Sequence, residues 1–140
     1  MRPLNRIILH CTATKEGDPC TVGTIREWHL KRKFSDIGYH YVIYADGSVN
    51  IGRPLDIAGS HSKGQNHDSV GVAYVGGLNK LGKPSDTMTV NQEIAFMTVV
   101  NSLRALFGDM SVHGHNEYSR KACPSFDVQK KFGFLNNIKN

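Results

Sequence analysis

The sequence has few cysteines, and this scarcity excludes the disulfide-rich secreted scaffolds. Its 140 residues contain three, Cys11, Cys20 and Cys123, and such an odd, small number does not indicate a disulfide framework. Free thiols fit a protein made in a reducing compartment, although the spacing leaves a Cys11–Cys20 bridge open. Internal repeats, low-complexity tracts and linkers are also lacking, so we predict one domain over residues 1–140.

Long hydrophobic runs are missing as well. The apolar stretch near the N-terminus is short and ends at His10, unlike a secretory signal, and no run approaches the roughly 20 apolar residues of a membrane span. We therefore expect synthesis in the cytoplasm and no membrane insertion. A target outside the cytoplasm would be reached only through other factors. With 39% hydrophobic and 21% charged residues, the chain resembles a soluble globular protein, which we expect to be a monomer.

Acidic residues are fewer than basic ones. The chain has 12 acidic and 17 basic residues. The resulting net charge of +5 favours anionic partners such as nucleic acid, a membrane surface or a cell-wall polymer. Its tight basic groups, at 31–33 and 130–131, are interpreted as solvated surface. Since no nucleic-acid-binding motif or interleaved aromatic residues accompany them, we expect no nucleic-acid partner.

Hydrophobic periodicity and turn residues predict an α/β fold with a central mixed β-sheet flanked by helices. The expected strands include a hairpin that turns at Asp46-Gly47 and a continuous apolar strand in the sheet centre. These strands cover residues 6–10, 39–52, 69–77 and 111–115. The expected helices carry N-terminal capping signals, which are Thr24 with Glu27, Thr89 with Gln92, and Asp127. They cover residues 24–34, 89–108 and 127–132.

Seven histidines are many for this length. We interpret His29 and His67 as ordinary core or surface residues. His10 ends the first predicted strand, at the rim of the sheet, where Cys11 should point to the opposite face. His113 and His115 are two residues apart and could share a face, and the sequence alone does not choose between them.

The residues around Cys123 are compatible with two chemical roles for its thiol. His10, His115 and Cys123 could supply imidazole and thiolate ligands to zinc, with one coordination position open for water, although their spacing is not that of a zinc finger. Alternatively, Cys123 could be the nucleophile of a cysteine hydrolase with a histidine as base, and the cation of Lys121 would then lower its pKa. Pro124 weakens this second reading, because it removes a backbone N–H where an oxyanion donor is often found.

Four fragments decide between these readings by resemblance. They are "ILHCTAT", "IGYHYVIYADG", "GSHSKGQNHDSVGVAYVGG" and "KACPSFD", in this order over nearly the whole chain. Together they closely resemble the zinc amidase lysozymes of T-odd bacteriophages, within the broader family of N-acetylmuramoyl-L-alanine amidases and peptidoglycan recognition proteins. The resemblance implies an enzyme that cleaves the amide between the lactyl group of N-acetylmuramic acid and L-alanine of peptidoglycan stem peptides.

The same resemblance implies roles for individual residues. His10, His115 and Cys123 would bind one Zn²⁺ per chain. Tyr39 and Lys121 would lie in the catalytic cleft without touching the metal. A second pair, His61 and Asn66, would lie near the substrate, although a turn-rich loop is the simpler reading of that stretch.

The sequence departs from the wider family at one position, and a second function competes with the enzyme. Ser125 stands where the wider family often has glycine after the Cys-Pro pair, and the phage subgroup shares this serine. The rival is a binding protein that recognises peptidoglycan without cutting it, or that inhibits a phage RNA polymerase, as phage relatives of this class do. Recognition-only relatives commonly lack a thiolate at the position of Cys123, so its presence favours the enzyme.

Overall fold

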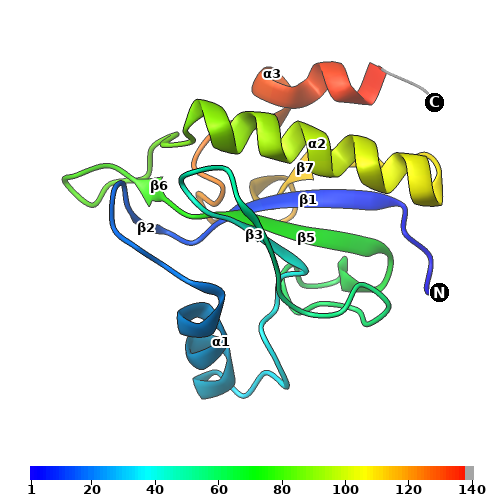
Figure 1. Cartoon of the computed structure of the whole chain (residues 1–140), viewed down its shortest axis with the longest axis horizontal. Coiled ribbons are helices and arrows are strands. Elements are labelled where there is room, and N and C mark those ends of the chain that lie inside the picture. The colour runs from blue at the N-terminus through cyan, green and yellow to red at the C-terminus, as the bar shows by residue number, and fades with distance from the viewer. Residues whose placement is uncertain (138–140) are drawn as a thin grey trace.

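A mixed five-stranded sheet, in the order β4-β3-β5-β1-β7, forms the middle layer of the fold. The structure is a computed structural model that describes residues 1–137. Two helices, α2 (Val90–Phe107) and α3 (Val128–Phe132), cover one face of the sheet, and α1 (Val22–Lys31) lies on the opposite side (Figure 1). The predicted α/β class, with helices flanking a mixed sheet, is confirmed.

Four strands of the sheet run in the same direction. β5 pairs in parallel with β1 and β3, and β1 pairs in parallel with β7. Only β4 is antiparallel, and it joins β3 through the predicted hairpin, in which Gly47 has a φ of 90°. All residues of β5 are buried, as its apolar run predicts for a central strand. The strands are β1 (Arg6–Cys11), β3 (Tyr41–Ile43), β4 (Val49–Ile51), β5 (Ser69–Tyr74) and β7 (Ser111–Gly114).

The second and third helices begin as predicted. Thr89 and Gln92 form a reciprocal capping box at the start of α2, and Asp127 caps α3 through the backbone N–H groups of Gln129 and Lys130. These contacts satisfy backbone donors that the first turn of a helix leaves without partners.

The predicted start of the first helix is wrong. Thr21 is its N-cap and accepts a hydrogen bond from the backbone N–H of Thr24, so the helix begins three residues before the expected Thr24–Glu27 box. The hydroxyl of Tyr44 accepts from the backbone N–H of Val22, which ties this earlier turn to the sheet. That long-range contact explains why the local capping pattern misleads.

A small parallel pair was also missed. β2 (Thr14–Lys15) and β6 (Gly77–Leu78) lie within segments that the sequence predicts as loop or strand end. Three short 3₁₀ helices complete the described elements, η1 (Asn66–Asp68), η2 (His115–Glu117) and η3 (Gly133–Asn137).

Alternation along β1 divides its side chains between the two faces. Ile7, Leu9 and Cys11 join the apolar core beneath α2 and α3. The side chains of Ile8 and His10 point to the other face, as the two-residue period of a strand requires. All three cysteines are free thiols, so the open Cys11–Cys20 bridge does not form. Among residues 1–137, no helix has the length and apolar character to cross a bilayer.

Candidate active site

The pairing of β1 with β7 brings two histidines together at the carboxyl edge of the sheet. Leu9 lies opposite Gly114 in the parallel register, so the next residues, His10 and His115, come side by side. Their ring centroids are 4.5 Å apart. Parallel strands end at the same edge, so neighbouring strands can supply one site although 105 residues separate these histidines in the sequence.

Cys123 joins this pair from the loop between η2 and α3. Its Sγ lies 3.8 Å from Nδ1 of His10. The candidate ligand atoms of His10, His115 and Cys123 all lie within 4.8 Å of one another. The backbone N–H of Cys11 also donates to this sulfur, at 3.2 Å, a contact that the sequence could not reveal.

The chemistry of these donors fits a metal ion. Nδ1 of His115 is buried and has no hydrogen-bond partner within the described chain, an arrangement that a bound cation would satisfy. Burial lowers the pKa of His115, and burial together with the neighbouring His61 and His115 lowers that of His10 well below its usual value. Both imidazoles are therefore neutral at pH 7 and carry lone pairs, and two nitrogens with one sulfur form a typical catalytic zinc set.

Cys123 is poorly suited to act as a free nucleophile. Its contact with Cys11 and its burial raise the pKa of its thiol, so in the protein without a cation this group is protonated at neutral pH. A cysteine nucleophile needs the opposite shift. The thiolate form is favoured when a metal ion takes the place of the proton.

Tyr39 lies beside the three donors. Its ring is 5.1 Å from that of His10 and 5.3 Å from that of His29, measured between centroids. Burial raises the pKa of its phenol, so Tyr39 keeps its proton at neutral pH and can donate a hydrogen bond.

Lys121 is exposed, two residues before Cys123. Its positive charge helps to lower the pKa of both His10 and His115, which places the ammonium group within electrostatic reach of the cluster. The structure therefore brings together the three predicted ligands and Tyr39, and the charge of Lys121 acts on both histidines.

His61 and Asn66 occupy different positions from each other. The ring of His61 is buried and contacts His10, with 2.8 Å between Nδ1 of His61 and Nε2 of His10. Asn66 is half-buried, and its side-chain oxygen accepts from the backbone N–H groups of His61 and Ser62. Their predicted closeness to the substrate stays a prediction.

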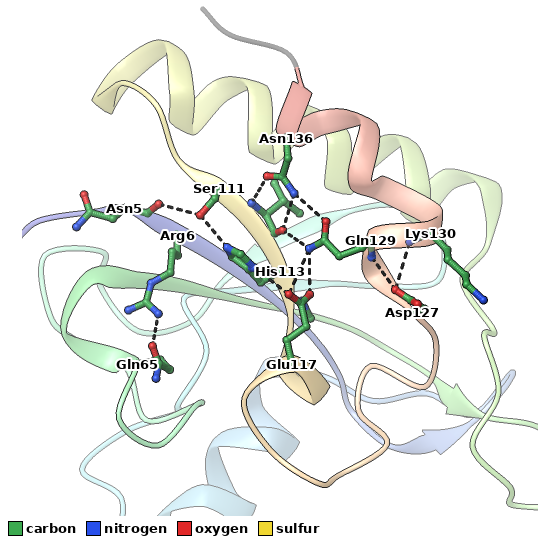
Figure 2. A network of polar contacts seen from close by, with 12 residues as sticks. Asn5, Arg6, Gln65, Ser111, His113, Glu117, Asp127, Gln129, Lys130 and Asn136 are labelled. Carbon is green, nitrogen blue, oxygen red and sulfur yellow. Dashed lines mark hydrogen bonds and ion pairs between the residues drawn. The ribbon is translucent and has the colours of Figure 1, made fainter.

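The other histidines have partners of their own. His113 contacts Glu117 and Ser111 in a polar network at the edge of the sheet (Figure 2). Nδ1 of His29 accepts from the backbone N–H of Gly38, and His67 is exposed, in agreement with their ordinary roles. The structure thus selects His115 over His113.

A partly buried set of two imidazoles and one thiol at the carboxyl edge of an α/β sheet is typical of a metalloenzyme. Comparisons with known proteins agree. The model of the family described as N-acetylmuramoyl-L-alanine amidase matches residues 1–126. The chain therefore belongs to the N-acetylmuramoyl-L-alanine amidase family, which is generally zinc-dependent.

Individual relatives give the same assignment. The endolysin of Enterobacteria phage K11 is 40% identical over 126 residues, which are 90% of this chain and 83% of the relative. The endolysin of Escherichia phage T7 is 40% identical over 124 residues, covering 89% and 82%. The structure of the N-acetylmuramoyl-L-alanine amidase LysC from Clostridium intestinale URNW has a TM-score of 0.85 at 27% identity, covering 99% of this chain and 88% of that chain. The predicted family is confirmed.

Proposed function

We propose that this chain is an N-acetylmuramoyl-L-alanine amidase that holds one zinc ion through His10, His115 and Cys123. Its reaction is hydrolysis of the amide between the lactyl group of N-acetylmuramic acid and L-alanine of peptidoglycan. The single observation that carries this proposal is the convergence of the three donor atoms within 4.8 Å, in a chain of the amidase family.

An amide resists hydrolysis because resonance stabilises its carbonyl and an amine is a poor leaving group. When bound, zinc supplies a Lewis acid that polarises a carbonyl oxygen and lowers the pKa of water to about 7. The protein contributes the position of the substrate and the charges around it. Lys121 stabilises the negative charge that develops on the carbonyl oxygen when the amide is attacked.

Tyr39 acts as a hydrogen-bond donor in this scheme. Its raised pKa keeps the phenol protonated, which excludes it as a ready base at neutral pH and suits it to orient water or the developing oxyanion. Glu117 is not assigned as the base, because its carboxylate already accepts from the backbone N–H of Gly114 and from Gln129.

The substrate in the cell would be the peptidoglycan wall. We propose that the whole chain acts as one catalytic unit, made in the cytoplasm as a monomer and brought to the wall by other factors. The net charge of +5 favours approach to an anionic wall polymer. Binding to a phage RNA polymerase stays a prediction, which a pull-down with the purified polymerase would test.

Digestion of purified peptidoglycan tests the reaction. We expect mass analysis to find stem peptides with a free L-alanine amine and glycan strands with a free lactyl carboxylate. Elemental analysis should find about one zinc per chain, and a chelator should abolish digestion until zinc is restored. Release of glycan fragments that retain the amide would contradict the amidase, and digestion that survives complete metal removal would favour the cysteine hydrolase.

A further inference from the structure

We infer that His61 is a positioning residue, which fixes the tautomer of His10 so that the unprotonated Nδ1 of His10 faces the metal position. The inference rests on the proposed function only for the identity of the ion. It concerns three side chains linked in series by hydrogen bonds, those of Ser69, His61 and His10. The donor in each hydrogen bond is fixed by the hydrogen bond before it.

The chain of hydrogen bonds begins at Ser69. The hydroxyl of Ser69 donates to the backbone carbonyl of Gln65, at 2.7 Å. A hydroxyl has one proton to give, so its 3.2 Å contact with Nε2 of His61 requires the imidazole to donate. His61 therefore carries its proton on Nε2, and its Nδ1 is an acceptor.

The second step passes this direction to His10. The ring of His61 is buried and faces the rings of His10 and His40, where a second proton would have no acceptor, so Nδ1 keeps its lone pair. Nδ1 of His61 and Nε2 of His10 are 2.8 Å apart, and therefore Nε2 of His10 donates. A neutral His10 then has its lone pair on Nδ1, the atom 3.8 Å from Sγ of Cys123. The opposite tautomer would point an N–H group at the ion.

The surroundings hold the ring of His61 in this orientation. A Cβ atom at Gly71 of β5 would come within 2.6 Å of the ring, and one at Gly59 within 2.7 Å. At Gly71 the imidazole alone excludes a side chain, whereas at Gly59 the carbonyl oxygen of Gly38, 2.5 Å away, excludes it together with the imidazole. The side chain of Asn66 fixes the backbone on the other side, through the N–H groups of His61 and Ser62. The loop thus forms a slot for one imidazole.

This arrangement changes the role expected of His61. Both of its ring nitrogens are engaged inside the protein, and its side chain is 8% exposed, so it is placed to act on the substrate only through His10. Partners of this kind orient metal-binding histidines and typically contribute roughly 10–100-fold to metal affinity.

Nuclear magnetic resonance of the wild-type protein tests the tautomer without any substitution. With ¹⁵N-labelled histidine, we expect His10 and His61 both to carry the proton on Nε2 in the metal-free protein. Addition of zinc should then shift Nδ1 of His10 and leave its Nε2–H in place. A proton on Nδ1 of His10, or zinc on its Nε2, would overturn the inference.

Substitutions at His61 test the effect on affinity. We expect His61→Leu to weaken zinc binding roughly 10–100-fold, measured by competition with a chromogenic chelator, and to give His10 a mixture of tautomers. His61→Asn keeps an oxygen acceptor near the position of Nδ1 and should recover most of the affinity. Unchanged affinity and tautomer in His61→Leu would also overturn the inference.

Two further variants separate positioning from general damage to the fold. His40 is a matched control, because it is equally buried and its Nδ1 accepts from the backbone N–H of Gly71 and not from a candidate ligand. We expect His40→Leu to keep zinc affinity within about threefold of the wild type once both are compared as folded protein. If His61→Leu does not fold, Ser69→Ala provides a second test, because it removes the acceptor of the Nε2–H group of His61. We call the series of hydrogen bonds from Ser69 through His61 to His10 the relay. A Ser69→Ala protein with the wild-type His10 tautomer and zinc affinity would contradict it.

The results can reject the inference about His61 and the proposed function separately. A protein that leaves peptidoglycan intact, yet shows the expected tautomer and zinc affinities, would reject the amidase and retain the relay. An active zinc amidase in which His61→Leu binds zinc normally would retain the enzyme and reject the relay.

Discussion

His113 and His115 lie two residues apart at the end of β7, and they differ in the partners that surround them. His113 has a carboxylate: its Nδ1 is 3.0 Å from Glu117, and its Nε2 is 2.8 Å from the hydroxyl of Ser111 (Figure 2). His115 lies beside His10 and Cys123, and its buried Nδ1 has no partner in the described part of the chain.

The difference separates a histidine whose nitrogens both have partners from a candidate metal ligand. Glu117 also accepts from the backbone N–H of Gly114, so the network around His113 fixes the turn that carries His115. One histidine therefore stabilises the edge of the sheet, and the other is left available to bind a metal ion. Composition alone cannot make this distinction, because both residues are histidines and lie two positions apart in the sequence.

Alanine substitution of the two histidines gives the largest expected contrast. His115→Ala removes a ligand, so we expect zinc binding and wall digestion to fall to background, measured by elemental analysis and by release of stem peptides. His113→Ala is the matched control and should keep both zinc and most of the activity. Loss of zinc in His113→Ala with retention in His115→Ala would reverse the assignment.

Removal of Lys121 should affect activity without affecting the metal. Loss of one group that stabilises an oxyanion typically costs roughly 10²–10³-fold in rate, so Lys121→Ala should lose that much activity and retain one zinc per chain. Lys130→Ala removes another exposed lysine from α3 and provides the control. A Lys121→Ala enzyme that digests walls at the full rate would show that its assigned role is wrong.

Glu117→Gln tests whether the network around His113 supports His115. The amide cannot accept all the hydrogen bonds that the carboxylate accepts, so we expect zinc affinity to fall about tenfold. Glu93→Gln is a suitable control, since the carboxylate of Glu93 pairs with Lys131 of α3 and not with His113 or Gly114. Equal zinc affinity in both variants would mean that the turn is held without Glu117.

The pH dependence of stability should be the smallest effect. In the folded protein, burial lowers the pKa of His29 and of His40 to about 4, from an ordinary value of 6.5. The unfolded chain therefore binds more protons between these values, and the stabilisation present above pH 6.5 is lost as the pH falls toward 4. We expect the Tm of the metal-free protein to fall by about 5–10 °C between pH 7 and pH 4.5. A flat profile, measured by calorimetry, would contradict the neutral state of these histidines.

Much of the fold follows from local patterns. The continuous apolar run of β5, the Asp46-Gly47 turn and the Thr89–Gln92 capping box were all predicted, because each depends on neighbouring residues. The start of α1 was wrong, since two threonines compete as caps and the hydroxyl of Tyr44, 22 residues away, favours the earlier one. β2 and β6 were missed because strands of two residues have no measurable period.

The site was less accessible from the sequence. Residue types and the resemblance indicate His10, His115 and Cys123, and the structure brings them together as that prediction requires. The contact of His61 with His10 spans 51 residues and has no local pattern. Glycines at positions 59 and 71 make room for the imidazole of His61, but the sequence alone does not show why these positions are glycine.

The separation of His10 and Cys123 by 113 residues has a consequence for how the protein would lose activity. His10 belongs to a strand inside the sheet, whereas Cys123 comes from a loop 113 residues further along the chain. A nascent chain on the ribosome would therefore stay inert until Cys123 had emerged, and a single proteolytic cut that released either residue would inactivate the enzyme.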